Sequence, residues 1–409
     1  MKKNDFVSRV RCLTGNHESL DSLLNDVSSH VVFEKNIKEF IYSFSSSVMK
    51  NTQAKAHPDL IALAYWMRKS NIEKLESGFF SAGLFKAPVG LVVHFAPANV
   101  DTIFIYSLFL SLLVGNKNIV RVSEKSSPQK DILIAILNQE INKPQFFDIR
   151  DRLSVITYPH SDEITQALCT FADMRVIWGG DSTVEKISSF SIKPTAKELK
   201  FSNKYSLCLL DANKLEELNT EDFQTLVKSF VNDTYWFGQQ GCSSPRSIIW
   251  MNSSNNQGLV CNFWSAVESK ARSMFGSTVL DADVMNKIVT SHLVATEVSD
   301  SKFQQNSKIL TRVHLPDLIT HNSIRELHCG SGLFYETEIN DLAELAFIVD
   351  RKTQTISYFG FDSALLRNEF AKAQIYPDRV VPVGQALEFD VFWDGNNLLD
   401  SLTRYVGFR

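Results

Sequence analysis

The residue best suited to covalent chemistry is Cys242, in the run FGQQGCSSPR. Residues 221–236 before it have the spacing of an amphipathic helix, and residues 247–251 after it that of a buried strand, so the cysteine lies in a tight connection. The small neighbours Gly241 and Ser243 leave the sulfur open to a substrate. Backbone N–H groups in such a turn can stabilise a thiolate and, later, an oxyanion. The pattern indicates a catalytic nucleophile; the alternative is an inert buried thiol, which is common for cysteine.

Composition narrows the class of protein. The chain has 409 residues and a formal net charge of −4, and its basic residues do not cluster, which argues against nucleic acid as a partner. The six cysteines are scattered without a CxxC pair, as in reduced, cytoplasmic proteins. The N-terminus shows no export signal, and the longest apolar run, at 103–114, is too short to span a bilayer and predicts a buried helix. We therefore expect a cytoplasmic enzyme with no membrane span.

One regular spacing of histidines raises the question of a metal. His314, His321 and His328 follow each other at intervals of seven, and Cys329 comes directly after the last of them. Pro316 would break a continuous helix through these positions. We therefore predict no metal site.

From about residue 89 the chain alternates short β-branched runs with helical patterns. The predicted strands are 90–96, 118–123, 153–158 and 175–179, and the predicted helices are 100–115, 128–141, 161–171 and 182–190. Strand and helix alternating at this spacing predict right-handed crossovers and a parallel, doubly wound sheet. Such sheets bind nucleotides at the carboxyl ends of their strands. The first 75 residues have helical patterns.

A second α/β segment begins near residue 201 with the strand pattern KYSLCLLD. We predict a helical region and NAD(P)-binding domain over 1–200 and a catalytic domain carrying Cys242 over 201–372. Residues 373–409 are expected to pack back onto the chain or to mediate oligomerisation. No low-complexity linker separates the two larger parts, so we expect domains packed closely around one cleft.

Four ordered segments carry a resemblance to a known family. They are HFAPANVDTIFIYSLFLSLLVGNKNIVRVSEKSS, RVIWGGDSTVEKI, QQGCSSPR and DRVVPVGQALEFDVFWDG. Together they resemble the bacterial luminescence-type (long-chain) fatty acyl-CoA reductases, a branch of the aldehyde dehydrogenase superfamily, over roughly residues 80–409. Four motifs in order are more specific than any one of them. The resemblance implies an aldehyde-dehydrogenase-like α/β fold and favours Cys242 as the nucleophile.

The resemblance also implies an oxyanion donor. The superfamily has a Pro-x-Asn turn whose amide helps to hold the oxyanion, and Pro97 to Asn99 match it. Asn99 is therefore the expected donor beside the Cys242 backbone N–H. The alternative is that Asn99 is the N-cap of the long apolar helix, with Asp101 in its first turn.

Cofactor residues are implied at two strand ends. Where the superfamily carries Lys-Pro-Ser-Glu against the adenosine ribose, this chain has Arg121, Val122, Ser123 and Glu124. The Arg121 guanidinium suits a ribose 2′-phosphate and favours NADPH, whereas Glu124 would accept from ribose hydroxyls, so NADH also fits. The alternative is a solvated strand end.

The pyrophosphate turn is implied in the run WGGDST, at the start of a helix, although the usual GxGxxG is missing. The matching residues are Gly180, Asp181 and Ser182. The Asp181 carboxylate would have to point away from the phosphates.

One residue that differs from the superfamily pattern bears on whether the acyl-enzyme is hydrolysed. Hydrolytic aldehyde dehydrogenases keep a glutamate base where this chain has Lys200, and Glu198 lies two residues away. Without a base, an acyl-enzyme would survive long enough to meet hydride.

The resemblance thus implies NADPH-dependent reduction of acyl-CoA to a fatty aldehyde through a Cys-linked thioester. The alternatives are a CoA-acylating or hydrolytic aldehyde dehydrogenase and a non-catalytic acyl-accepting subunit. The expected acyl donor is acyl-CoA or a synthetase partner. The chain is also expected to form a homo-oligomer.

Overall fold

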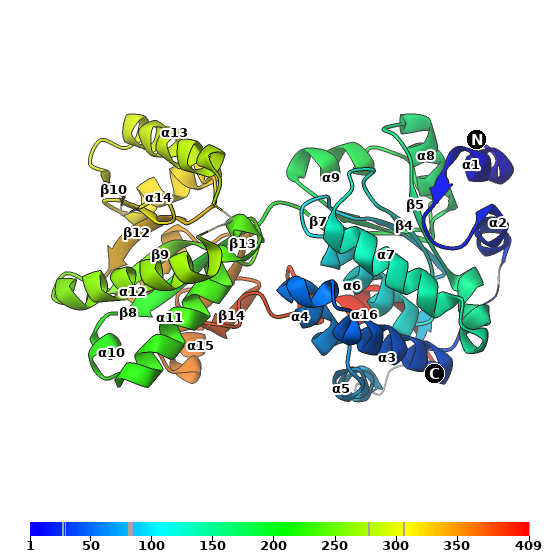
Figure 1. The fold of residues 1–409 in the computed structure, drawn as a ribbon, viewed down its shortest axis with the longest axis horizontal. Coiled ribbons are helices and arrows are strands. Elements are labelled where there is room, and N and C mark those ends of the chain that lie inside the picture. Colours follow the sequence, from blue (N-terminus) through cyan, green and yellow to red (C-terminus); the bar gives the residue numbers. More distant parts are fainter. Residues whose placement is uncertain (27, 29, 81–84, 277–278, 306, 409) are drawn as a thin grey trace. The chain divides into compact units, whose positions relative to one another are not determined.

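The computed structural model describes residues 1–26, 28, 30–80, 85–276, 279–305 and 307–408. The chain divides into two units, each with its own sheet (Figure 1). Unit 1 comprises Met1–Asn203 and Phe389–Arg409, and unit 2 comprises Lys204–Glu388. The boundary therefore follows the last strand of the first sheet.

The sheet of unit 1 has the strand order β1-β5-β4-β3-β6-β7. Its strands are β1 (Arg11–Cys12), β3 (Leu91–Phe95), β4 (Lys117–Arg121), β5 (Leu153–Thr157), β6 (Met174–Trp178) and β7 (Lys197–Phe201). All neighbours are parallel except β1, which pairs antiparallel with β5 at one edge. The four predicted strands are β3 to β6, and the predicted parallel sheet is confirmed.

Helices connect these strands and cover them. They are α1 (Lys3–Arg9), α2 (His17–Asn25), α3 (Lys35–Lys50), α4 (Pro58–Trp66), α5 (Lys69–Phe80), α6 (Thr102–Leu113), α7 (Pro128–Ile141), α8 (Asp162–Phe171), α9 (Asp181–Ser188) and α16 (Leu398–Ser401), with the 3₁₀ turns η1 (Ala54–Ala56) and η2 (Pro144–Arg152). Along β3, Val92 packs in the cluster of α3, α6 and α7, and Val93 in that of α1, α2 and α8. Successive side chains point to opposite faces, so helices cover both faces of a doubly wound sheet.

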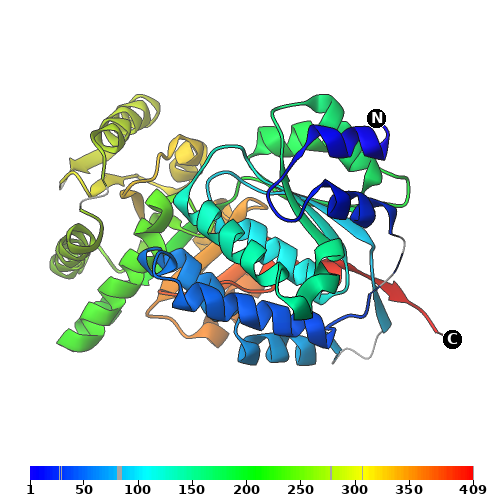
Figure 2. The same cartoon turned by 45° about the vertical axis from the view of Figure 1, so that its right-hand side comes forward.

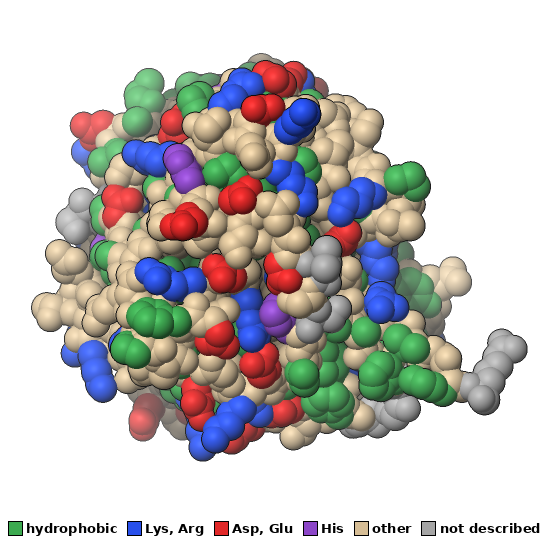
Figure 3. Space-filling model, turned by 90° about the vertical axis from the view of Figure 1, so that its right-hand side faces the viewer, with side chains coloured by type: hydrophobic (Ala, Val, Ile, Leu, Met, Phe, Trp, Pro, Cys, Tyr) green, Lys and Arg blue, Asp and Glu red, His purple; other side chains and the backbone are tan. Residues whose placement is uncertain are grey.

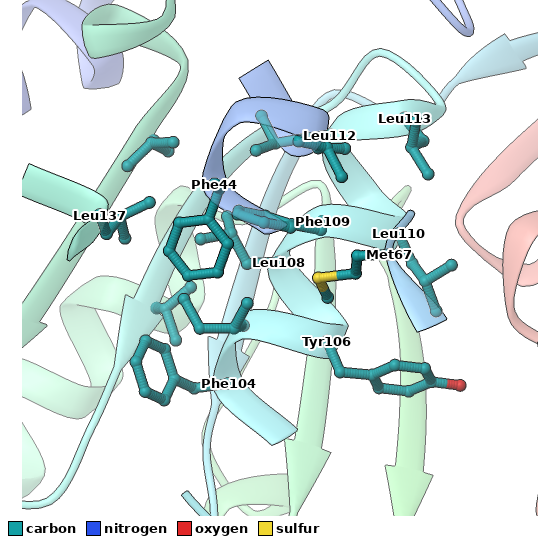
Figure 4. Packing of buried hydrophobic residues seen from close by; sticks show 14 of the residues in the cluster. Phe44, Met67, Phe104, Tyr106, Leu108, Phe109, Leu110, Leu112, Leu113 and Leu137 are labelled. Atoms are coloured by element: carbon teal, nitrogen blue, oxygen red, sulfur yellow. The ribbon is translucent and has the colours of Figure 1, made fainter. Parts of the chain in front are cut away.

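Helix α6 lies at the centre of the larger core. All of its residues are buried, as the apolar run predicts. Figure 4 shows Phe44 of α3 beside Phe109, and their rings meet edge to face with centroids 4.9 Å apart. The chain turns at Gly115, shortly after the end of the helix, and the φ angle of this residue is 81°. A Cβ at this position would lie 2.7 Å from the His30 carbonyl oxygen. Only glycine fits this tight return into β4.

The sheet of unit 2 has the order β10-β11-β12-β9-β8-β13-β14. Its strands are β8 (Tyr205–Asp211), β9 (Pro245–Met251), β10 (Lys302–Gln305), β11 (Thr311–His314), β12 (Leu333–Ile339), β13 (Thr353–Phe359) and β14 (Arg379–Pro382). Among the described strands of this sheet, the β10–β11 pair is antiparallel and the other pairs are parallel. The helical elements are α10 (Asn213–Glu216), α11 (Thr220–Tyr235), η3 (Trp236–Gln239), α12 (Gln257–Phe275), α13 (Asp281–Glu297), α14 (Leu318–Ile324), η4 (Arg325–Leu327), η5 (Leu342–Phe347) and α15 (Ser363–Lys372).

The C-terminal part of the chain belongs to both units. Residues 373–388 lie in unit 2, because β14 pairs with β13, and the chain joins unit 1 from Phe389. There β15 (Phe392–Trp393) pairs with β16 (Asn396–Asn397), and β17 (Thr403–Val406) pairs with β2 (Phe85–Pro88). Figure 2 shows β17, in red, leading to the C-terminus. The segment that packs back onto unit 1 is thus shorter than 373–409.

Two surface properties bear on partners. Among the described residues, no helix is long and apolar enough to cross a membrane. On the face shown in Figure 3, lysine and arginine side chains are interspersed with aspartate and glutamate. A mixed surface of this kind gives no single-sign field to attract a polyanion.

Candidate active site

Cys242 is exposed, in a turn between η3 and β9. The Ser244 N–H donates to the Gly241 carbonyl oxygen at 3.0 Å, which closes the turn around the cysteine. The predicted order of helix, turn and strand is confirmed by α11 and β9. The alternative of a buried thiol is wrong.

The backbone of Cys242 is held from a neighbouring strand. The Ser206 hydroxyl, at the start of β8, donates to the Cys242 carbonyl oxygen at 2.7 Å. The same hydroxyl accepts the Thr355 N–H at 3.1 Å, which orients it. An exposed side chain on a fixed backbone is the arrangement that a preorganised nucleophile needs.

Small residues beside the cysteine are required by packing. A Cβ on Gly241 would lie 3.1 Å from the Ser244 hydroxyl and 3.6 Å from a methyl group of Leu387. Ser243 and Ser244 are buried while Cys242 is exposed. The turn therefore directs its polar neighbours inward and leaves the thiol outward.

In unit 1 the predicted cofactor residues gather at one edge of the sheet. Arg121, at the end of β4, lies opposite Phe95 of β3, which in turn lies opposite Ile177 of β6. The loops after these three adjacent strands carry Asn99, Ser123, Glu124 and Gly180, and the first turn of α9 carries Asp181 and Ser182. This is the carboxyl edge, where the strand order also reverses, and it is where such sheets bind dinucleotides.

Asn99 is exposed in the loop between β3 and α6. The N-cap of α6 is Asp101, so the alternative that Asn99 caps this helix is wrong. The chain bends at Ala98 and Asn99 before the first helical turn begins. The Asp101 carboxylate accepts a hydrogen bond from the Ser127 hydroxyl. The Asn99 amide is therefore not needed to begin the helix.

The loop after β4 has a buried support. Arg121 is half-buried, with its guanidinium 5.3 Å from the centroid of the Tyr158 ring. Ser123 is half-buried and Glu124 is exposed. The Lys130 ammonium, which is buried, donates to the Ser123 carbonyl oxygen at 2.8 Å. This hydrogen bond holds the loop on its buried side.

The turn after β6 leads into helix α9 through Gly180 as its N-cap. The Asp181 carboxylate accepts the Asn203 N–H at 3.0 Å, so it has a partner at the end of unit 1. Ser182 is exposed. The first N–H groups of a helix lack intrahelical acceptors, which makes this turn suitable for an anion.

A family model described as acyl-CoA reductase (LuxC) matches residues 84–405. The chain belongs to the acyl-CoA reductase (LuxC) family. No curated protein matches its sequence significantly.

Solved aldehyde dehydrogenases share the fold of this LuxC-family protein. Indole-3-acetaldehyde dehydrogenase in complex with NAD+ is 15% identical, with a TM-score of 0.63 over 90% of this chain and 83% of that chain. The aldehyde dehydrogenase KauB from Pseudomonas aeruginosa is 14% identical, with a TM-score of 0.64 over 99% and 88%. Thermus thermophilus 1-pyrroline-5-carboxylate dehydrogenase is 11% identical, with a TM-score of 0.63 over 95% and 84%. The predicted aldehyde-dehydrogenase-like α/β fold is confirmed.

In this LuxC-family protein Glu198 is part of an ion-pair network. It lies on β7 and accepts from the Arg175 Nε at 2.6 Å, and the Lys200 ammonium lies 2.7 Å from its other oxygen. Burial by itself would raise the pKa of Glu198, but the hydrogen bonds from Lys200 and Arg175 outweigh it and lower the pKa. A carboxylate stabilised in this way is a weak base.

The three evenly spaced histidines lie in different environments. His314 is exposed on β11. His321 is buried with its Nε2 2.6 Å from the Tyr205 hydroxyl, and burial lowers its pKa to about 3. His328 is buried with its Nε2 2.8 Å from the Leu333 carbonyl oxygen, and burial lowers its pKa far below the usual value. The two buried rings are neutral members of hydrogen-bond networks in unit 2.

Sequence reasoning missed two residues whose side chains hold the backbone of the candidate site segments. Ser206 and Lys130 give no local signal, since a serine at a strand start and a lysine in a helix are ordinary. Their roles come from contacts with the Cys242 turn and with the loop after β4.

Proposed function

We propose that this chain is an NADPH-dependent acyl-CoA reductase that forms a fatty aldehyde through a thioester on Cys242. The observation that carries the proposal is the exposed thiol on a backbone held by Ser206, in a member of the acyl-CoA reductase (LuxC) family. The fold of solved aldehyde dehydrogenases supports it.

The reaction begins when the Cys242 thiolate attacks the thioester carbon of acyl-CoA. The bond to the CoA sulfur breaks, CoA leaves as a thiolate that takes a proton from water, and the acyl group remains on Cys242. Hydride is the species that a reduced nicotinamide cofactor would supply when bound. After hydride addition the oxyanion collapses, expels the Cys242 thiolate and releases the aldehyde. The Cys242 N–H and the Asn99 amide are the proposed donors to the oxyanion.

Residues of unit 1 fit a nicotinamide dinucleotide. The turn at Gly180 and the start of α9 would hold the pyrophosphate, with Ser182 beside it. Arg121 would hold a 2′-phosphate, its guanidinium already ordered against Tyr158. One structural neighbour, indole-3-acetaldehyde dehydrogenase, is known in complex with NAD+. Ser123 and Glu124 would accept from ribose hydroxyls, which keeps NADH as an alternative to NADPH.

The nucleophile is tested by replacing Cys242 with alanine. The variant should neither take up label from radiolabelled tetradecanoyl-CoA nor oxidise NADPH, since no thiolate is present to form the thioester. Cys261, which is also exposed but lies on α12, provides the matched control. The Cys261→Ala variant should label and turn over normally. Full labelling of the Cys242→Ala variant would place the chemistry on another residue.

A second candidate is a hydrolytic or CoA-acylating aldehyde dehydrogenase. The ion pairs of Glu198 argue against hydrolysis, because a base typically contributes about 100- to 10,000-fold and this carboxylate is weakened as one. Labelled enzyme, freed of acyl-CoA, should keep its label in water and lose it to CoA or to NADPH. Rapid release of free fatty acid in water would favour the hydrolytic enzyme, and label that CoA removes but NADPH does not would favour an acyl-accepting subunit.

A further inference from the structure

Two short turns of unit 2 with left-handed backbone contact each other beside Cys242. The φ angles of residues 237–239 are 57°, 59° and 63°, and those of residues 330–332 are 79°, 56° and 80°. Residues other than glycine rarely adopt such angles, and they persist only where surrounding contacts impose them. The contacts that hold these positive φ angles therefore show which residues fix the cysteine turn.

Gln239 supplies the main contacts. Its side chain is fully buried and makes three hydrogen bonds. Its Oε1 accepts the Gly332 N–H at 2.9 Å, and its Nε2 donates to the carbonyl oxygens of Pro245 at 2.9 Å and Leu333 at 3.0 Å. The bond to Pro245 closes the 239–245 loop, and Cys242 lies at the middle of that loop.

The two turns make further bonds around this glutamine. The Ser331 N–H donates to the Gly238 carbonyl oxygen at 2.8 Å, and the Gln240 Nε2 donates to the Cys329 carbonyl oxygen at 2.7 Å. A Cβ on Gly332 would lie 2.1 Å from the Ile309 carbonyl oxygen, so this position excludes any other residue. The second turn therefore requires glycine at this position, and three hydrogen bonds join the turn and its flanking Cys329 to residues 238–240.

We propose that Gln239 is the positioning residue of Cys242. By closing the 239–245 loop and binding it to the 330–332 turn, Gln239 sets where the thiol and the Cys242 N–H point during acyl transfer. The inference rests on the proposed function, because it assumes that Cys242 receives the acyl group.

The test compares two reactions of the same thiol in Gln239→Met, which keeps the side-chain length and removes the hydrogen bonds. Acyl transfer from tetradecanoyl-CoA requires the thiol and the oxyanion donor in register, and misplacement of about 1 Å costs about 100-fold. We expect a loss of that order in the acylation rate constant, with the KM for acyl-CoA nearly unchanged. Alkylation of Cys242 by iodoacetamide needs no oxyanion donor and should stay close to the rate in the unmodified protein.

A second variant, Gln239→Glu, adds a pH readout. Its carboxylate can still accept from Gly332 but faces the carbonyl oxygens of Pro245 and Leu333, whereas the protonated form can donate to one of them. Acyl transfer by this variant should therefore recover relative to the unmodified protein as the pH is lowered, and Gln239→Met should show no such recovery.

Two controls separate positioning from loss of folding. Gln257→Met removes one hydrogen bond, to the Ser253 carbonyl oxygen, from an exposed glutamine at the start of α12 and should leave acylation near normal. Val267→Ala makes a cavity in α12, in the core of unit 2, and should lower stability without slowing acylation. An equal loss of acylation in Val267→Ala, or normal acylation in Gln239→Met, would overturn the positioning role alone. Acyl labelling of Cys242→Ala would overturn this role and the proposed function together.

Discussion

The candidate residues of the two units lie at opposite ends of their own sheets. In unit 1 the candidate residues follow the carboxyl ends of β4, β3 and β6, whereas in unit 2 Cys242 precedes the amino end of β9. Loops after neighbouring parallel strands come together as a consequence of the strand order. Strand order alone does not fix the position of a turn that precedes a strand. The Cys242 turn is instead held by hydrogen bonds to parts of the chain that are distant in sequence.

This difference predicts different costs of substitution. The residues of unit 1 that we propose to contact a ligand are exposed or half-buried, so changing them should alter rate or affinity with little loss of stability. Residues of unit 2 such as Ser206 and Gln239 are buried and act through the backbone of the cysteine turn. Their replacement should alter both the geometry of the thiol and local stability.

The largest effect on rate in unit 1 is expected at Asn99. Asn99→Ala should lower the rate of acyl reduction about 100- to 1,000-fold, because it removes one preorganised donor to the oxyanion. Its unfolding free energy should hardly change, since the side chain is exposed and Asp101 occupies the cap position.

The matched control is Asp101→Ala, which removes the acceptor of the Ser127 hydroxyl. This variant should lose stability on the order of 1 kcal/mol, the typical value of one hydrogen bond, while its chemical step stays close to normal. Single-turnover kinetics and urea denaturation of both variants decide the matter. A stable Asn99→Ala enzyme with a normal rate would remove Asn99 from the oxyanion site.

A smaller effect is expected at Arg121, on the affinity of the cofactor. Arg121→Ala should raise the KM for NADPH by about 10- to 100-fold, the value of a charge-assisted hydrogen bond to a phosphate. The KM for NADH should change little, because NADH lacks the 2′-phosphate. Steady-state kinetics with both cofactors measure the ratio, and equal losses for the two would show that Arg121 does not recognise that phosphate.

Sequence reasoning succeeded where patterns were long and local. Helix α7 spans the predicted residues 128–141, because its Ser127-Pro128 start and apolar spacing are both visible in the sequence. Strands β3 to β6 lie within two residues of their predicted ends. The exposed turn at Cys242 also follows from local residue types.

Sequence reasoning failed where the outcome depends on distant contacts. Gln239 and Gly332 are 93 residues apart, and no pattern links them. The alternative that Asn99 caps α6 was wrong, because the chain bends at Ala98 and Asn99 and the helix takes Asp101 as its N-cap position. Residues 373–388 belong to unit 2 because β14 pairs with β13, a long-range choice that composition does not reveal.

The smallest effect on turnover, but a clear one on stability, is expected at Asp233. This buried carboxyl on α11 accepts the N–H groups of Gly384 at 2.6 Å and Ala386 at 3.1 Å. Burial raises its pKa to about 7, although these hydrogen bonds and Arg379 oppose the shift and Glu388 adds to it. The folded protein therefore binds a proton that the unfolded chain, with a pKa of 3.8, releases. Stability from this group is present below pH 3.8 and is lost as the pH rises through about 7.

Asp233→Asn removes this titration, so comparison with the unmodified protein isolates it. The stability advantage of the unmodified protein over the variant should shrink between pH 5 and pH 8 by an amount on the order of 3 kcal/mol, since one pKa unit corresponds to about 1.4 kcal/mol and about two units separate pH 5 from the folded pKa. Urea denaturation at each pH measures the difference. If the advantage grew with pH instead, the two N–H donors and Arg379 would outweigh burial, and the carboxylate would be ionised in the folded protein. Because α11 leads through η3 to the cysteine turn, that result would place a buried negative charge on the helix that precedes the nucleophile of unit 2, a feature that the exposed loops of unit 1 do not share.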